Sequence, residues 1–349
     1  MSRARKTPAP PPRRATALDV ARLAGVSRSA VSRTLTEGAS VSPETRAKVL
    51  EAAQALGYHR NALVRGMITR RSGIIGVVTG GLDNPFLAMA LETLSRRLQR
   101  DGRKAFIYSG DAESDLQRAL PSMIEYRVDG CMFLTNDLSP HATARYRQHG
   151  VPMVVLFSAG TERMGPVSGP APVGAVTADN FEVSRRLAHH MADRGAKRFA
   201  YVAGHPDSSS SRAREAGFRR GLAERGQVLG GVVAGDFVYG GGLEAARALL
   251  GGETRPDAIF CGNDLMAMAV LDVARGELGL SVPAELMVAG FDDIPLAAGA
   301  AYDLTSVRQP VAAMIDAAAD MLGGFIDDPS SASREVTIGA ELVLRGSTG

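Results

Sequence analysis

Three short helical patterns within residues 16–57, separated by turn and capping residues, constrain the fold of this chain more than any other feature. The pattern predicts a first helix that starts at Asp19 and stops before Gly25, whose freedom at positive φ suits a tight turn. Ser27 then stands where an N-cap must lie to open a second helix over residues 28–36. Two helices joined by so short a turn predict a helix-turn-helix unit.

A third helix completes this unit. Ser42 is its predicted cap, Pro43 occupies the first helical position, and Gly57 stops it. In the second helix Val31 and Leu35 lie one turn apart, so both can face the first helix. The sequence therefore predicts three short helices around one small core.

The opposite face of the second helix is polar, and helix-turn-helix proteins place that face in the DNA major groove. The residues predicted to read bases there are Arg28, Ser29, Ser32 and Arg33. Arginine can donate two hydrogen bonds to guanine O6 and N7, whereas serine is permissive and says little about the base that it faces.

The distribution of charge supports the same interpretation independently. Residues 1–72 hold 14 Lys and Arg against 4 Asp and Glu, a balance of +10, and the remaining 26 basic and 33 acidic residues give −7. A basic front end binds the phosphate backbone through counterion release, and an acidic body is repelled by it. Residues 1–15 are predicted to be a disordered, proline-rich basic arm, which either contacts DNA or is simply solvated.

The headpiece, residues 16–60, resembles the lactose-repressor (LacI/GalR) family of transcription regulators. The matching motifs are Thr16-Ala17-Leu18-Asp19-Val20-Ala21-Arg22-Leu23-Ala24-Gly25-Val26-Ser27, Val31-Ser32-Arg33, Val41-Ser42-Pro43-Glu44-Thr45-Arg46 and Leu56-Gly57-Tyr58. By position, the resemblance assigns major-groove contacts to Arg28, Ser29 and Arg33, in agreement with the helical phase.

Residues 61–72 resemble the hinge helix and linker of that family. The hinge is about two turns long and contains Gly66, so it is expected to fold only where something holds it. The resemblance implies that paired hinge helices enter the DNA minor groove with Asn61 and Leu63, and that Met67 wedges into a base step. The family usually carries leucine at Met67 and proline at Arg60; a plain interdomain linker is the alternative.

From residue 73 onward, short apolar runs alternate with amphipathic helical stretches. The runs that fit strands buried on both faces are 74–78, 105–108, 131–134, 153–157, 199–202, 258–261 and 287–289. The clearest helical stretches are 181–193, 212–225, 243–250 and 265–275. This alternation predicts parallel sheets wound on both sides, and about 275 residues are long for one core.

The body is therefore predicted to consist of two doubly wound lobes. The first comprises about 73–159 plus 308–328, and the second about 160–307 plus 329–349. The family resemblance implies a periplasmic-binding-protein-like body with three crossover strands and an effector cleft between the lobes.

Effector contacts are expected at the carboxyl ends of the strands, where open α/β sheets bind their ligands. The candidate effector-binding residues, at positions that the family uses, are Asn84, Phe86, Arg214, Phe237, Asn263 and Asp292. A guanidinium, an amide and a carboxylate can hold vicinal hydroxyls, and an aromatic ring can cover a sugar face. We expect a sugar or sugar derivative as the effector.

Several of these residues have structural alternatives. Asn84, and the pair Asp179-Asn180, could cap the helices that begin beside them. Asp264 is expected to cap the helix that starts at Leu265, whereas Asn263 is expected to contact the effector. Arg214 could pair with a surface acid instead.

Catalysis is not expected, because the sequence lacks the nucleophile-elbow, phosphate-loop, zinc-protease and dinucleotide motifs. No cofactor or metal is predicted, since the adjacent His189 and His190 would point about 100° apart on a helix. Cys131 and Cys261 lie in apolar strands and are predicted to be buried, reduced thiols. With neither a signal peptide nor an apolar run of membrane-spanning length, the expected location is cytoplasmic.

One headpiece reads about half a site, so specific binding requires two of them on a pseudo-palindromic operator in double-stranded DNA. We expect a homodimer, since the family's tetramers carry an added C-terminal heptad segment that is absent here. The prediction is a transcriptional repressor whose operator affinity responds to a small molecule. The alternatives are control by a protein partner on the body surface and a DNA-tethered enzyme.

Overall fold

The computed structural model describes residues 15–36, 39–58, 71–110, 113–134, 140–158 and 171–349. The chain divides into two compact units, residues 1–70 and residues 71–349. All but residue 15 of the predicted basic arm, and the predicted hinge residues Asn61, Leu63 and Met67, lie outside the described residues.

The first unit is a three-helix headpiece formed by α1 (Ala17–Ala24), α2 (Arg28–Thr34) and α3 (Pro43–Ala55). Its core consists of small and branched apolar side chains contributed by all three helices, namely Val20, Ala21, Val31, Val49, Ala52 and Ala53. The predicted caps Ser27 and Ser42 are confirmed.

Two headpiece boundaries differ from the prediction. The first helix starts at Ala17 rather than Asp19, because the Thr16 side chain caps it and the Asp19 carboxylate accepts from the Thr16 backbone N–H. The second helix ends at Thr34 rather than at residue 36, and Leu35 is its C-cap.

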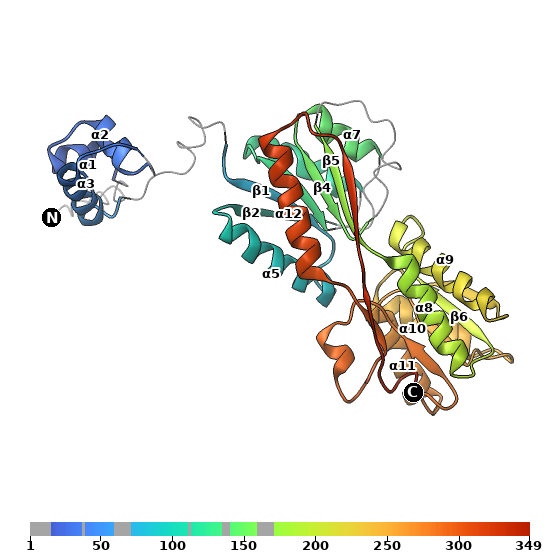
Figure 1. The fold of residues 1–349 in the computed structure, drawn as a ribbon. Coiled ribbons are helices and arrows are strands. Elements are labelled where there is room, and N and C mark those ends of the chain that lie inside the picture. Colours follow the sequence, from blue (N-terminus) through green and yellow to red (C-terminus); the bar gives the residue numbers. More distant parts are fainter. Residues whose placement is uncertain (1–14, 37–38, 59–70, 111–112, 135–139, 159–170) are drawn as a thin grey trace, which may run out of the picture. The chain divides into compact units, whose positions relative to one another are not determined.

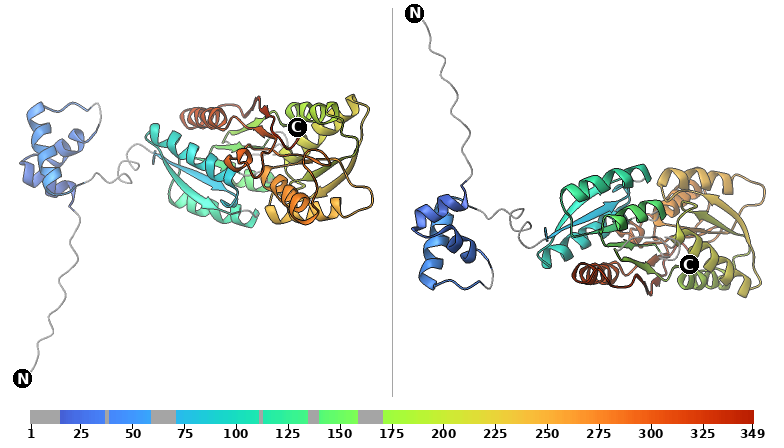
Figure 2. Two further views of the ribbon diagram at one scale, coloured as in Figure 1. Left: turned by 90° about the horizontal axis from the view of Figure 1, so that it is seen from below. Right: turned by 90° about the horizontal axis from the view of Figure 1, so that it is seen from above.

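The second unit contains two lobes, and the first lobe is built on a six-stranded parallel sheet. Its order is β11 (Arg334–Ile338), β5 (Val173–Ala178), β4 (Met153–Leu156), β3 (Gly130–Leu134), β1 (Ile74–Thr79) and β2 (Lys104–Ser109). Helices α5 (Pro85–Arg100) and α12 (Val311–Asp327) cover one face, and α6 (Glu113–Glu125) and α7 (Pro140–Gln148) cover the other (Figure 2).

Successive side chains of β3 point to opposite faces of the sheet and pack into two different cores. Met132 and Leu134 join the core beneath α5 and α12, whereas Cys131 and Phe133 join the core beneath α6 and α7. The prediction that every strand is buried on both faces is wrong for β2, which lies at the sheet edge and leaves Ile107 48% exposed.

The second lobe has a four-stranded parallel sheet in the order β7 (Leu229–Ala234), β6 (Phe199–Ala203), β8 (Ala258–Cys261) and β9 (Met287–Ala289). One face is covered by α8 (Asn180–Asp193) and α9 (Ser209–Glu224), and the other by α10 (Tyr239–Leu250) and α11 (Asp264–Asp272). A π-helical turn, Val273–Glu277, continues α11. Helices α8 and α9 pack closely because Gly217 and Gly221 leave room for the backbone of α8.

The lobe boundaries predicted from the sequence require correction. Residues 173–178 and 334–338 were not among the predicted strands and fall in the predicted second lobe, but they form β5 and β11 and pair within the first-lobe sheet. Their residues fit a strand in either sheet, and only pairing with β4 decides the lobe. A 3-10 turn (Pro295–Ala298) and an antiparallel pair, β10 (Ser306–Arg308) and β12 (Glu341–Val343), complete the body (Figure 1).

Of the helices that the structure describes, none combines the length and the apolar character needed to cross a membrane.

Candidate recognition helix and effector site

The predicted base-reading residues share one exposed face of α2. Arg28, Ser29, Ser32 and Arg33 are all exposed, whereas Val31 and Thr34 are buried against the rest of the headpiece. At the start of the helix, the Ser27 Oγ accepts from Ala30 N at 3.2 Å and lies 2.9 Å from the Ser29 Oγ.

A contact from α3 fixes the other end of this helix. The Arg46 guanidinium donates from Nη1 to the Thr34 carbonyl at 3.2 Å, and from Nη2 to the Ala39 carbonyl at 3.4 Å. Helix α2 is therefore held at its cap, through its buried side and at its last turn, and its polar side faces solvent.

In the second lobe, Arg214 on α9 lies at the centre of a buried polar cluster. It is 4% exposed, its Nε donates to Asn180 Oδ1 at 2.8 Å, and its Nη1 donates to the Gly262 carbonyl. The Cζ lies 3.5 Å from the centroid of the Phe291 ring. Burial lowers the pKa of Arg214, and the neighbouring carboxylate of Asp292 opposes that shift.

Asp292 is the principal acid of this cluster. It is 8% exposed and accepts from Gln309 Nε2 at 2.8 Å. Burial raises the pKa of Asp292 to about 7, and Arg214 and the hydrogen bond from Gln309 limit the rise. The backbone at Asp292 has φ of 115°, which is unusual for a side chain other than glycine and indicates local strain.

The prediction that Asp264 caps α11 is wrong. Asn263 is the N-cap of α11, with its Oδ1 accepting from Met266 N at 3.0 Å, and its Nδ2 donates to the Phe237 carbonyl at 2.8 Å. Asp264 does not cap the helix; its carboxylate accepts from Ile294 N at 2.8 Å and from Ser306 Oγ at 2.6 Å. Asn263 takes the capping role predicted for Asp264, because asparagine and aspartate are equally good caps.

Phe237 lies beside the same cluster, with its ring centroid 5.9 Å from the Arg214 Cζ. The structure thus connects Arg214, Phe237, Asn263 and Asp292 through contacts and charge interactions.

The two first-lobe candidates have packing roles in the structure. Asn84 caps α5 by accepting from Phe86 N at 3.0 Å, as the structural alternative proposed. Phe86 is 4% exposed and packs edge-on against Phe157, with ring centroids 4.8 Å apart.

Two residues of this buried polar cluster were not among the predicted effector contacts. Gln309 follows the crossover strand β10, and Asn180 follows β5 and was considered only as a possible cap. Asp179 is the residue that caps α8, by accepting from Glu182 N at 3.1 Å. An amide two residues after the apolar run 173–178 is the sequence signal that could have identified Asn180.

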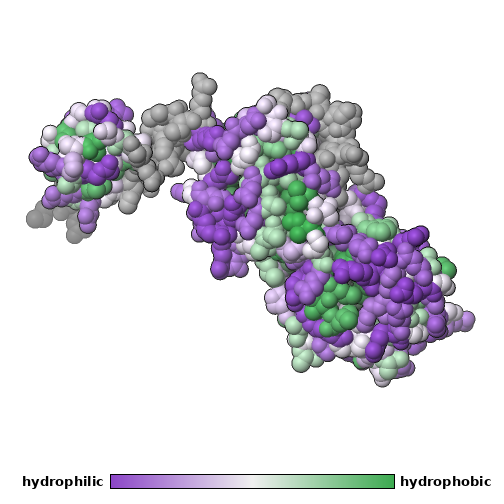
Figure 3. Space-filling view, viewed as in Figure 1, coloured by the Kyte–Doolittle hydropathy of each residue, from purple (hydrophilic) through white to green (hydrophobic). Residues whose placement is uncertain are grey.

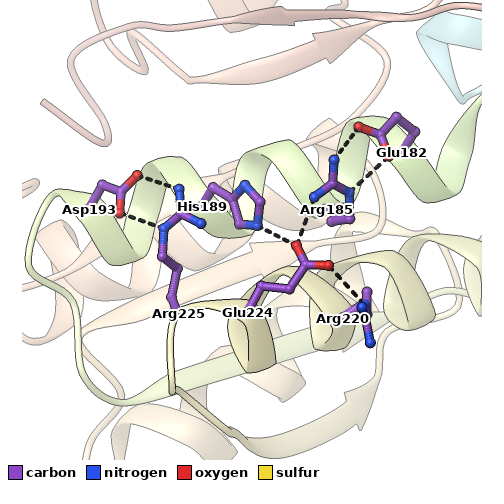
Figure 4. Close-up of polar contacts among 7 residues, drawn as sticks. All are labelled: Glu182, Arg185, His189, Asp193, Arg220, Glu224 and Arg225. Carbon is purple, nitrogen blue, oxygen red and sulfur yellow. Dashed lines mark hydrogen bonds and ion pairs between the residues drawn. The ribbon is translucent and has the colours of Figure 1, made fainter.

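A charged network joins the outer surfaces of α8 and α9, as drawn in Figure 4. The Glu224 carboxylate accepts from Arg185 Nη1 at 2.7 Å and lies 2.8 Å from His189 Nε2; these contacts, with one from Arg220, lower its pKa to about 2. The hydrophilic surface of the second lobe in Figure 3 includes these helices.

His189 and His190 have separate partners. His190 Nε2 lies 2.9 Å from Thr348 Oγ1, whereas His189 pairs with Glu224. Among the described residues, no group of three or more His, Cys, Asp or Glu could hold a metal. Cys131 and Cys261 are free and buried, as predicted.

Comparisons with known proteins agree with this architecture. Residues 16–61 match the family described as bacterial regulatory proteins, lacI family, and residues 188–348 match a periplasmic binding protein-like domain. The chain is 32% identical over 338 residues to the ribose operon repressor of Escherichia coli (strain K12), covering 95% of this chain and 99% of that protein.

Solved structures show the same fold over nearly the whole chain. A transcriptional regulator CelR–cellobiose complex shares 29% identity at a TM-score of 0.71, covering 96% of this chain and all (100%) of that one. A lac repressor dimer, solved with operator and the anti-inducer ONPF, matches at a TM-score of 0.85 with 24% identity, covering 96% and 99%. The predicted fold class, a helix-turn-helix headpiece followed by an α/β body of parallel sheets, is confirmed.

Proposed function

Because the chain belongs to the lacI family of bacterial regulatory proteins, and is a DNA-binding transcriptional repressor of that family, we propose a specific mode of action for it. Two chains bind one pseudo-palindromic operator in the cytoplasm, and a sugar or sugar derivative at the Arg214 cluster sets the operator affinity. Catalysis has no part in this function.

The observation that carries the DNA-binding part is the exposed polar face of α2. Arg28 and Arg33 are exposed there and Val31 is buried behind them, so both guanidinium groups can enter a major groove without disturbing the core. The charge of +10 on residues 1–72 supplies affinity for phosphates that falls as salt rises. By position, Asn61, Leu63 and Met67 would contact the minor groove between the two half-sites.

The buried cluster around Arg214 supports a polyhydroxylated effector. Arg214 and Asp292 offer charge-assisted donors and acceptors out of water, and Phe237 and Phe291 supply aromatic surface beside them. The named relatives point the same way, since one represses a ribose operon and another was solved with cellobiose. Asn84 and Phe86 would approach the effector from the first lobe, and Asn263 would hold the Phe237 loop in place.

Effector and operator must influence each other reciprocally. A ligand that contacts both lobes stabilises one lobe arrangement, and that arrangement sets whether two headpieces can reach successive half-sites. The lac repressor solved as a dimer on operator supports two chains per site.

The experiment starts by selecting duplexes bound by the full-length protein from randomised DNA. Arg33→Ala should weaken binding to the selected duplex by about 10- to 100-fold and leave non-specific binding nearly unchanged. Arg96→Ala, on the exposed side of α5, is the matched control and should have no effect. Failure to enrich any symmetric sequence would refute the proposed DNA recognition.

Calorimetry of the full-length protein against sugars, sugar acids and nucleobases tests the effector. Heat from a carbohydrate, lost in Arg214→Gln, supports the proposed site. A response to no carbohydrate, together with capture of a specific protein on the body surface, would favour control by a protein partner instead.

A further inference from the structure

Asn180 bridges the two lobes at the crossover between β5 and α8. It is the first residue of α8 and is 4% exposed. Its Oδ1 accepts from Arg214 Nε at 2.8 Å, while its Nδ2 donates to Thr177 Oγ1 at 3.1 Å and to the Ala178 carbonyl at 2.9 Å. Both ends of one buried amide are therefore hydrogen bonded, each to a different part of the body.

The partners of this amide belong to different lobes. Thr177 and Ala178 end β5, which lies between β4 and β11 in the first-lobe sheet, whereas Arg214 lies on α9 of the second lobe (Figure 1). A continuous chain of hydrogen bonds thus leads from the guanidinium, through one side chain, to the last residues of a first-lobe strand.

The segment at the end of β11 also crosses between the lobes, and it contacts the chain beside Asn180. The Asp179 backbone N–H donates to the Ile338 carbonyl at 2.9 Å, and Ile338 ends β11, which also returns to the second lobe. The residue that precedes Asn180 is therefore hydrogen bonded to a second segment that connects the lobes.

Arg214 has little freedom to move independently of Asn180. Its Nη1 donates to the Gly262 carbonyl, its Cζ lies over the Phe291 ring, and its Nε donates to Asn180. A ligand that pulls on the guanidinium must either carry the Asn180 amide with it or break the Nε–Oδ1 bond.

We propose that Asn180 is a positioning residue that holds Arg214 and transmits its displacement to the β5–α8 crossover. This inference rests on the proposed function only in taking Arg214 as an effector contact. A polar effector that engages the guanidinium thereby alters the junction on which the angle between the lobes depends.

Hydrogen–deuterium exchange of the full-length protein without effector tests the transmission. Arg214→Lys removes the Nε donor and should speed exchange of the peptide spanning residues 173–183 by roughly fivefold or more. Peptides over β1 and β3, in the same sheet, should keep their wild-type protection. Arg219→Lys, on the same helix and paired with Glu215, is the matched control and should change nothing in that peptide.

A double-variant comparison separates transmission from a purely structural role. Asn180→Asp still offers an acceptor to Arg214 but can no longer donate to Thr177 and Ala178. It should loosen the 173–183 peptide alone, and adding Arg214→Lys should then have no further effect on that peptide. Thr177→Val removes one of the two acceptors of the Asn180 amide and should reduce the further effect of Arg214→Lys on that peptide, which keeps the comparison should Asn180→Asp fold poorly.

The proposal would be overturned if the effects of Asn180→Asp and Arg214→Lys on exchange of the 173–183 peptide were additive. It would also be overturned if that peptide exchanged at the same rate in Arg214→Lys as in Arg219→Lys. Because no effector is present, those results would leave sugar binding at Arg214 untouched. A failed sugar screen would likewise leave the transmission standing.

Discussion

Replacing Asp292 with Asn should change how the stability of the protein depends on pH. The pKa of Asp292 is raised from an ordinary value of 3.8 to about 7, chiefly by burial. In the folded state this carboxyl therefore holds its proton up to near neutrality, whereas in the unfolded chain it releases the proton near pH 4. Its contribution to stability is present at low pH and is lost as pH rises from about 4 to about 7.

The size of the effect follows from this shift. A difference of about three pKa units, at ~1.4 kcal/mol each, amounts to about 4 kcal/mol once both states are ionised. Between pH 5 and pH 8 the wild-type protein should lose about 3 kcal/mol that Asp292→Asn does not lose. Asparagine cannot ionise, and it can still accept from Gln309.

Urea unfolding followed by circular dichroism at pH 5, 6, 7 and 8 measures this difference. Asp207→Asn is the matched control, because Asp207 is exposed, and it should track the wild type within about 0.5 kcal/mol at every pH. The reasoning fails if the free-energy difference between Asp292→Asn and wild type is constant across this range. It also fails if Asp292→Asn becomes less stable relative to the wild type as pH rises.

Three further predictions concern the rest of the molecule. Burial lowers the pKa of His190, so the stability that it contributes above about pH 6.5 is lost on acidification. His190→Gln should therefore reduce the acid sensitivity of the melting temperature between pH 5 and 6.5. A pH profile identical to that of the wild type would count against this. Gly217→Ala should lower the free energy of unfolding in urea by more than ~2 kcal/mol, because its Cβ would overlap the Phe181 carbonyl. Gly240→Ala, with open space around its Cβ, should be neutral or stabilising. Equal effects of the two substitutions would show that close packing at Gly217 is not the cause. Met67→Ala should weaken specific operator binding several-fold and spare non-specific binding in anisotropy titrations, and an unchanged operator affinity would remove the wedge role.

Features set by local chemistry were predictable from the sequence. Ser27 and Ser42 cap the helices that they were predicted to cap, because an N-cap acts within three residues of itself. The exposed face of α2 followed from the helical period and the position of Val31. Errors of one or two residues arose where neighbours compete for one role, as with Asn263 and Asp264.

Features set by long-range pairing were not predictable. Strand β5 was not predicted from the sequence, and only its pairing with β4 places residues 173–178 in the first lobe. The bond from Arg214 to Asn180 joins residues 34 positions apart, and nothing local in the sequence marks either partner for the other. In the buried cluster around Arg214, the contacts between the side chains could not be predicted from the sequence.

We propose that two headpieces bind one operator together, and native mass spectrometry of the full-length protein with its selected duplex measures this directly. We expect a complex of two chains per full duplex, and much weaker binding to a duplex that carries a single half-site. One chain per duplex, with equal affinity for the full site and the half-site, would contradict it.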